Sequence, residues 1–235
     1  MAVEPSLRCG SPSVVGHPSR LPSRWTSTGL RRQAFAWAYD RRSRDLEALG
    51  AASHRRRLVA GLGGLVVDVG AGNGLLFEHL PGSVAGLVAV EPDPYLRARA
   101  IEAASVAAVA VRVVAGTASA LPLPDGVCDA AVCSLVLCSV PDLPAALAEI
   151  RRVLRPGGEL RFYEHVVAAE QRRRRWQRLA EPAWSALVGG CRLTRDTVAA
   201  VGDAGFDVVG CEVFEFRPTW TAVLTSPHVL GTARR

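Results

Sequence analysis

The sequence predicts an α/β fold built on a doubly wound, mostly parallel sheet. Two observations carry this prediction. From residue 64 onward, short apolar runs of strand length alternate with stretches of helical period. A glycine-rich turn follows the first apolar run directly. The chain has 235 residues, 49% of them hydrophobic, which suits one α/β domain with an appendage and a substantial core.

The expected elements follow one another with short connections. The expected strands are 65–69, 86–90, 109–115, 128–135 and 159–167. The expected helices are 75–80, 94–104, 143–154 and 172–188. A further helix over 195–204, capped by Thr194 and ended by Gly205, precedes two closing strands within 207–216 and 228–235. We expect these closing strands to pair antiparallel and the crossovers to be right-handed.

The N-terminal quarter differs from the rest of the chain. Residues 1–29 are rich in Pro and Ser without a period, which predicts a disordered or loosely docked tail. Residues 30–60 alternate Arg with apolar side chains at helical spacing, which predicts a helical cover of one or two amphipathic helices. The triplet Arg55–Arg57 is interpreted as a solvated helix face.

Composition excludes several function classes. Residues 1–60 contain 11 Arg against 4 acids and the remainder 17 Arg against 18, so the net charge of +6 belongs to the N-terminal quarter. A basic nucleic-acid groove on the body is therefore not expected. The absence of lysine excludes a Walker A or Schiff-base lysine. No apolar run reaches the roughly 20 residues of a membrane span, and no secretory signal is visible, so we expect a cytoplasmic protein.

The six cysteines suggest no metal site by their spacing. They contain no CxxC pair and no Cys/His ligand cluster along the sequence. We therefore expect reduced thiols packed in apolar surroundings and no bound metal. Cys138 is assigned to such packing.

The turn after the first strand predicts a nucleoside ligand. Gly70, Gly72 and Gly74 form a GxGxG pattern, and Leu75 stands where a dinucleotide fingerprint needs its third glycine. A ligand without pyrophosphate has no need of that glycine. Taken alone the pattern is weak, because glycine at such a turn is often only structural.

Two carboxylates strengthen this interpretation. Glu91 ends the second strand, where a carboxylate can accept both hydroxyls of an unphosphorylated ribose or simply face water. Asp68 lies inside an apolar strand and must be compensated if buried. It can accept hydrogen bonds from the glycine-loop amides or face an ammonium group of the ligand. Both uses fit a ligand that carries an amino acid.

Four motifs in order and spacing carry a family resemblance. They are VVDVGAGNG, VEPDP, LPLPDGVCDAAVCSLVLCSVPD and EIRRVLRPGGEL. Across residues 64–168 they resemble the class I S-adenosylmethionine-dependent methyltransferases of the type 11 group. The resemblance implies a Rossmann-like seven-stranded sheet with an antiparallel last strand and helices on both faces, a methyltransferase domain over 61–235, and S-adenosylmethionine as methyl donor.

A narrower resemblance extends over nearly all of 64–235. The segments SLVLCSV, RVLRPGGELRFYEHV, EPAW, GCRLTRDT and PHVLGTA are similar to the thiol S-methyltransferase branch of methyltransferase-like proteins. Eukaryotic members carry an N-terminal hydrophobic anchor, whereas this chain has a polar tail. Membrane attachment is therefore not expected.

The resemblance also implies the cofactor-binding residues. It places the methionine part against Asp68, Gly70, Ala71, Gly72 and Gly74. It places the ribose on Glu91 and the adenine beside Pro92, Asp93, Thr117 and Ala118. It places Ser134 and Leu135 beside the donor sulfonium. Many members have Asp where this chain has Thr117, which leaves the adenine contact to a backbone carbonyl or to the Thr117 hydroxyl.

The acceptor side has fewer candidates. His165, at the end of the fifth strand, is the catalytic candidate for proton acceptance or thiolate stabilisation; the alternative is a packed histidine hydrogen-bonded to Glu164 or to the backbone. His228 is a second candidate. We expect apolar side chains to cover the acceptor pocket from two sides. One side is expected to consist of Phe35, Trp37 and Tyr39, and the other of Trp176 and Trp184. For the second side, the alternative is a solvated basic turn with two core tryptophans.

The function predicted is methyl transfer from S-adenosylmethionine to a small-molecule acceptor, most specifically a thiol. The alternative is O-, C- or N-methylation of a secondary metabolite or quinone-like acceptor. A nucleic-acid methyltransferase is disfavoured because CSLVLCSV stands where an Asn-Pro-Pro-Tyr-like motif is expected. The intact glycines and Glu91 disfavour a non-catalytic binding protein. We expect no nucleic-acid or membrane partner and a monomer or homodimer.

Overall fold

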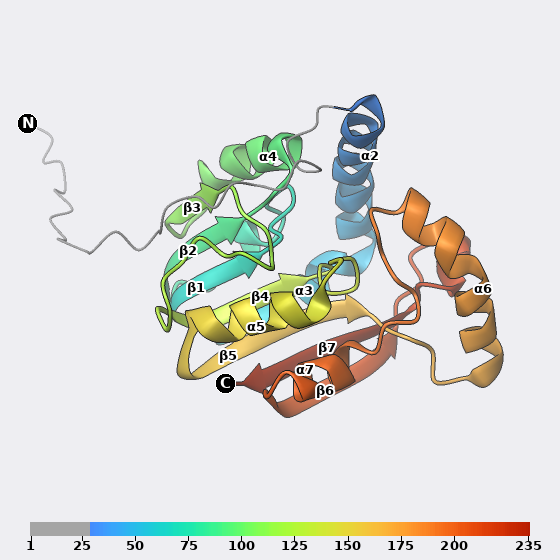
Figure 1. Ribbon diagram of the computed structural model, residues 1–235. Helices are drawn as coiled ribbons and strands as arrows, with labels where there is room; N and C mark the ends of the chain where they lie inside the picture. The colour runs from blue at the N-terminus through green and yellow to red at the C-terminus, as the bar shows by residue number, and fades with distance from the viewer. Residues whose placement is uncertain (1–28) are drawn as a thin grey trace, which may run out of the picture.

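A computed structural model of the chain describes residues 29–235 (Figure 1). The predicted tail over 1–29 therefore lies, except for Gly29, outside the described residues, and so does Cys9. Everything below concerns the described part.

Seven strands form one sheet in the order β3-β2-β1-β4-β5-β7-β6. The strands are β1 Gly64–Val69, β2 Val84–Val90, β3 Val111–Val114, β4 Cys128–Ser134, β5 Leu154–His165, β6 Asp207–Glu215 and β7 Pro227–Arg234. All neighbours pair parallel except β7, which is antiparallel to both β5 and β6. The predicted fold class is confirmed. Strand order reverses between β1 and β4, which is where such sheets bind ligands.

The helical elements vary widely in length. They are α2 Leu30–Leu46, the π-helical turn η1 Glu47–Ala51, α3 Ala52–Val59, the 3-10 turn η2 Phe77–His79, α4 Pro94–Ala104, α5 Leu143–Val153, α6 Gln171–Leu187, α7 Thr197–Asp203 and the 3-10 turn η3 Trp220–Val223. Among the described residues, no helix combines the length and apolar character needed to cross a membrane.

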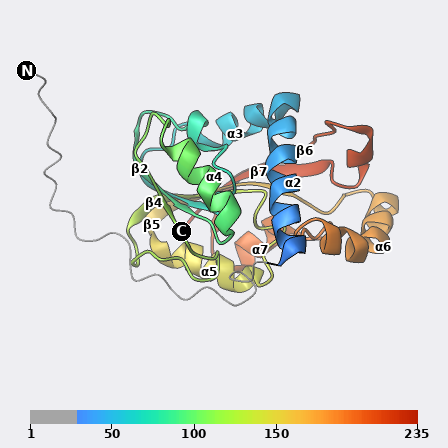
Figure 2. The same ribbon diagram turned by 90° about the horizontal axis from the view of Figure 1, so that it is seen from above.

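Alternating side chains of the strands create two cores. Val67 and Val69 of β1 face one side, where α5 and α7 pack. Val66 faces the other side, where α3 and α4 pack. Figure 2 shows α5 and α7 along one side of the sheet, away from α3 and α4. Because both faces are covered, β1 is a continuous apolar run interrupted only by Asp68.

Two predicted helices differ in the structure. The helix expected over 75–80 is only the turn η2, because the chain enters β2 soon afterwards, and Leu76, Phe77 and Leu80 pack into the core beside α3. The helix expected over 195–204 begins later. Asp196 caps it by accepting a hydrogen bond from Ala199 N, while Thr194 bonds to Glu181. Gly205, with φ of 82°, ends it as predicted.

The predicted N-terminal helices are present as α2 and α3. Gly50, with φ of 120°, separates them, a conformation that side chains other than glycine rarely adopt. Arg56 and Arg57 are exposed as predicted. The prediction was wrong for Arg55, which is buried and ion-paired with Glu47. Burial of a guanidinium requires such a partner.

A substitution at Gly231 of β7 tests the packing between β7 and β5. It lies opposite Phe162 in the sheet register, and an added Cβ would overlap the fully buried Phe162 ring. We expect Gly231→Ala to lower the free energy of unfolding by about 1–3 kcal/mol, measured by urea denaturation. The control is Gly210→Ala on β6, where a Cβ meets no atom of the described residues within 4 Å, and a change within about 0.5 kcal/mol is expected. Equal effects of the two variants would contradict this packing.

Candidate active site

A cavity of about 620 Å³ opens at the carboxyl ends of the parallel strands. This volume lies within the roughly 300–1,000 Å³ typical of small-molecule sites. Eight predicted cofactor residues line it, as does the catalytic candidate His165; the eight are Gly70, Gly72, Glu91, Pro92, Asp93, Thr117, Ala118 and Leu135. They come from the ends of β1, β2, β3, β4 and β5, which the fold brings to one edge of the sheet.

Glu91 fixes the shape of the glycine turn. One oxygen of its buried carboxylate accepts from Gly72 N at 2.9 Å, and the other accepts from Asp93 N at 2.7 Å. Gly70 N donates instead to Val90 O at 2.8 Å. Burial raises the pKa of Glu91 to about 7, although both backbone N–H groups oppose that shift. The carboxylate therefore shapes the loop and faces the cavity at once.

Four predicted cofactor residues do not line the cavity. They are Asp68, Ala71, Gly74 and Ser134. Gly74 permits close packing, since an added Cβ would lie 2.8 Å from Ala103. The N–H groups of Gly70 and Ala71 donate to Val90 O and that of Gly72 donates to Glu91, so none of these three bonds to Asp68, which was one of its two predicted uses.

Asp68 lies behind the glycine turn with an unused acceptor. Among the described residues its Oδ2 atom has no hydrogen-bond partner. Burial raises the pKa of this carboxyl group to about 7. Ser134 Oγ is likewise buried without a partner in the described part of the chain. Both orphaned atoms lie at the carboxyl ends of strands that border the cavity.

Asn73 attaches α2 to the glycine turn, a role the sequence did not reveal. Its side-chain amide donates to Asp40 Oδ1 at 2.7 Å and to Ser43 Oγ at 3.0 Å. This attachment lets Phe35 and Tyr39 of α2 line the cavity, as predicted. Burial raises the pKa of Tyr39 to about 12.

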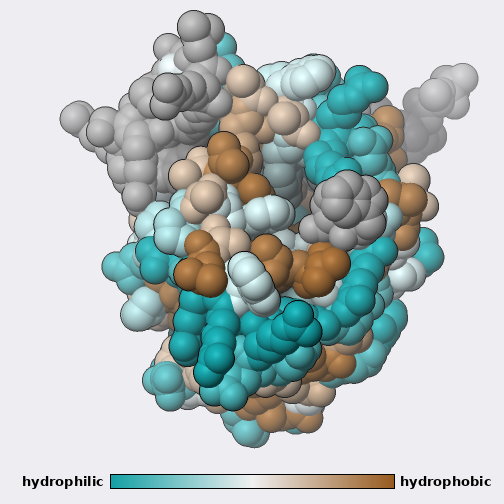
Figure 3. Space-filling model, turned by 90° about the vertical axis from the view of Figure 1, so that its right-hand side faces the viewer, coloured by the Kyte–Doolittle hydropathy of each residue, from teal (hydrophilic) through white to brown (hydrophobic). Residues whose placement is uncertain are grey.

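Two of the predicted tryptophans point away from the cavity. Trp37 of α2 and Trp176 of α6 are 56% and 57% exposed, so the expectation that they form its lining was wrong. Trp184, nearer the end of α6, does line it. Figure 3 shows the face that carries α6, where hydrophobic and hydrophilic side chains are intermixed.

Glu164 holds the loop that follows β4. Its fully buried carboxylate accepts from Val136 N at 2.9 Å, Leu137 N at 2.8 Å and Cys138 N at 3.0 Å. The loop begins at Leu135, whose φ of 60° is unusual for a residue other than glycine. Burial raises the pKa of Glu164, while the three amides oppose the shift. The predicted alternative, in which Glu164 pairs with His165, is not seen.

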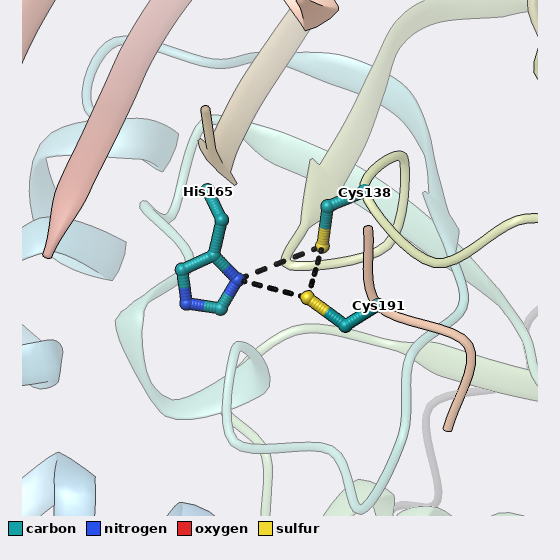
Figure 4. A group of neighbouring side chains, drawn as sticks. All are labelled: Cys138, His165 and Cys191. Carbon is teal, nitrogen blue, oxygen red and sulfur yellow. Dashed lines mark hydrogen bonds between the residues drawn. The ribbon is translucent and has the colours of Figure 1, made fainter. Parts of the chain in front are cut away.

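Three side chains from separate segments meet at the cavity wall. Cys138 Sγ lies 3.7 Å from His165 Nδ1, and Cys191 Sγ lies 3.5 Å from the same nitrogen (Figure 4). The two sulfurs are 3.9 Å apart. The Cys138 thiol and the His165 ring beside it hold the pKa of Cys191 well below its usual range, while the pKa of Cys138 is raised. Sequence spacing did not predict this group, because its members are 26 and 27 positions apart.

His228 lines the same cavity, as predicted. Its ring centroid is 4.5 Å from that of His165. Nδ1 donates to Ser226 O at 2.9 Å, because a carbonyl oxygen can only accept. Burial lowers the pKa of His228 to about 3, so this imidazole is neutral at physiological pH.

Comparisons with known proteins identify the family. A family model described as a methyltransferase domain matches residues 67–162. Human thiol S-methyltransferase TMT1A is 33% identical over 177 residues, which cover 72% of this chain and 69% of that protein. This chain belongs to the same methyltransferase family. Human thiol S-methyltransferase TMT1B is 42% identical over 112 residues, but the match spans only 47% of the chain and 45% of the relative.

Solved structures support the methyltransferase fold. An S-adenosylmethionine-dependent methyltransferase from Thermotoga maritima, titled a possible histamine N-methyltransferase, superposes with a TM-score of 0.64. It is 20% identical and covers 86% of this chain and 98% of its own. At this identity the likeness concerns the fold alone.

The described residues of this methyltransferase fit S-adenosylmethionine. Glu91 offers a buried carboxylate at the cavity for a ribose, and Gly70 and Gly72 line the same cavity. The Asp68 Oδ2 atom, behind the turn, has no partner among the described residues, and the ammonium group of S-adenosylmethionine needs such an acceptor. The cavity also leaves its His165 end for a second small molecule.

Glu91 provides the first test of this site. We expect Glu91→Ala to weaken S-adenosylmethionine binding by roughly 100-fold or more in calorimetry, because the charged acceptor and the loop geometry are both lost. Glu102→Ala, which removes an exposed carboxylate from α4, serves as the control and is expected to leave the affinity unchanged. Unchanged affinity in the Glu91 variant would overturn the placement of the ribose.

Glu164 provides the second test. Glu164→Gln turns an amide N–H₂ group toward backbone donors, so we expect the free energy of unfolding to fall by about 1.5–3 kcal/mol. Cys138 should also react faster with a thiol reagent as its loop loosens. Urea denaturation and mass-resolved labelling measure the two effects, with Glu102→Gln as the control. An unchanged free energy of unfolding together with an unchanged labelling rate of Cys138 would refute the anchoring role of Glu164.

Proposed function

We propose that this methyltransferase methylates the sulfur of small, largely apolar thiols. The observation that carries the proposal is the chemistry of the acceptor end of the cavity. The carboxylates nearby are occupied by backbone groups: Glu91 and Glu164 each accept loop amides, and Asp142 accepts from Ala145 N. The imidazole of His165 remains to take a proton or stabilise a thiolate.

A thiol is the acceptor that this arrangement suits. Its pKa of about 8.5 means that modest stabilisation yields enough thiolate at neutral pH. An alcohol needs a well-positioned general base, and His228, whose pKa is lowered to about 3 by burial, is too weak a base for this role. The thiol S-methyltransferase names of the TMT1A and TMT1B relatives support the same acceptor class.

Different residues of the chain bind the cofactor, exclude water and contact the acceptor. When bound, S-adenosylmethionine supplies an electrophilic methyl group on a sulfonium. Glu91 and the glycine turn hold the cofactor, and the aromatic side chains Phe35, Tyr39 and Trp184 restrict the entry of water. His165 faces the acceptor sulfur. Holding both reactants in one geometry is the main source of rate in such a displacement.

The remaining predictions concern the whole protein. We propose the cytoplasm as its location, which is supported by the five free cysteines of the described residues, since reducing compartments keep thiols free. A monomer or homodimer without a nucleic-acid or membrane partner stays a prediction.

An acceptor screen tests the proposed function. S-adenosylhomocysteine release is measured with alkyl and aryl thiols, with charged thiols such as cysteine and glutathione, and with phenols and quinols. We expect apolar thiols to be the best acceptors, because charged groups must lose hydration to enter an aromatic-lined cavity. Glu91→Ala is the inactive control. Turnover of quinols or phenols with inert thiols would replace this proposal with O- or C-methylation.

A further inference from the structure

The cluster of Cys138, His165 and Cys191 has the composition of a metal site. Two sulfurs and one imidazole nitrogen converge at the cavity wall from the β4 loop, the end of β5 and the segment after α6 (Figure 4). Both cysteines are nearly inaccessible, and His165 is half-buried. Thiolate and imidazole donors together favour soft or borderline divalent cations, Zn²⁺ in particular.

The distances match tetrahedral coordination. With Zn–S near 2.3 Å and Zn–N near 2.05 Å, a regular tetrahedron places two sulfurs ~3.8 Å apart and a sulfur and nitrogen ~3.6 Å apart. The cluster shows 3.9 Å between the sulfurs, and 3.7 and 3.5 Å from Cys138 and Cys191 to His165 Nδ1. All three agree to within the ~0.2 Å tolerance expected of a metal site.

The surrounding backbone holds the ligands at this separation. Arg192 N donates to Cys138 O at 2.9 Å, which ties the two cysteine-bearing segments together. Glu164 holds Cys138 N, and Cys191 N donates to Val188 O at 3.0 Å. A site with fixed ligands needs little reorganisation to bind a cation.

We propose that Cys138, His165 and Cys191 bind Zn²⁺ or a similar thiophilic divalent cation through Sγ, Nδ1 and Sγ. All three residues line the cavity, so the fourth coordination position opens into it. Three protein ligands with one open position characterise catalytic zinc sites, whereas structural sites have four.

The open position gives the cation a role in the reaction. This role rests on the proposed function: the acceptor thiol becomes the fourth ligand of the cation. Its sulfur donates a lone pair to the cation, the S–H bond breaks, and the proton leaves to water. His165 then stabilises the thiolate as a metal ligand and does not accept its proton. The nucleophile is thus ionised and held at the wall of the cavity at neutral pH.

Metal binding is tested without any turnover. The full chain is stripped with a chelator under reducing conditions, then titrated with Zn²⁺ or Co²⁺. We expect one equivalent of Zn²⁺ by elemental mass spectrometry, and for Co²⁺ the thiolate charge-transfer and intense visible bands of a tetrahedral centre. Benzenethiol added to the Co²⁺ protein should change these bands if it enters the fourth position.

Variants identify the ligands. Cys138→Ser and Cys191→Ser should each weaken Zn²⁺ binding by at least about 100-fold, more than the loss of an outer-shell partner. Cys211→Ser, an exposed thiol on β6, is the matched control and should bind Zn²⁺ normally. Circular dichroism and calorimetry with S-adenosylmethionine show that the variants are folded. Folded, fully reduced wild-type protein that binds no Zn²⁺ would overturn the site.

The same preparations separate the two proposals. S-adenosylhomocysteine release is measured with thiols in stripped and Zn²⁺-loaded protein. Turnover that depends on Zn²⁺ supports both the site and its role. Turnover by metal-free protein that binds no Zn²⁺ overturns the metal site and keeps the thiol acceptor. Zn²⁺ binding without any thiol turnover keeps the site and overturns the proposed function.

Discussion

The buried carboxylate of Glu164 determines how the acceptor end of this methyltransferase is built. It accepts three consecutive amides of the loop after β4, and so supports the left-handed backbone at Leu135. Three unsatisfied donors in an apolar interior would cost several times the roughly 1–3 kcal/mol of one. The next residue along β5 is His165. The end of β5 thus fixes the loop that carries Cys138 and also carries the His165 imidazole, which lies beside Cys138.

A second buried carboxylate, that of Glu91, holds a loop at the predicted cofactor end of the cavity. Glu91 joins the glycine turn to the start of the next loop, and Asn73 joins that turn to α2. Burial raises the pKa of Glu91, so its amide contacts must offset the cost of keeping a charge there. The parallel strands place both carboxylates at the edge of the sheet where the cavity opens.

The sequence predicted what depends on neighbours along the chain. Continuous apolar runs located the strands, and the glycine spacing with Glu91 predicted residues that do line the cavity. The failures involve side-chain contacts that helix and strand spacing do not encode. Arg55 is buried in a pair with Glu47 across η1, and the chain after Gly74 forms only the turn η2 before it enters β2. Cys138, His165 and Cys191 meet only because β5 lies beside β4 and the segment after α6 returns to it, which no local spacing encodes.

The family match covers the glycine-turn end of the cavity and only part of the acceptor end, where it includes Cys138. The glycine turn and Glu91 lie within the matched residues 67–162, whereas the acceptor-side groups Phe35, Cys191 and His228 lie outside it. These outer segments touch one another, since Gly189 lacks the Cβ that would collide with the Phe35 ring. The segments before and after the matched domain therefore meet over the cavity. Because a fold does not by itself specify function, these outer segments are where relatives that share the matched domain can differ in acceptor.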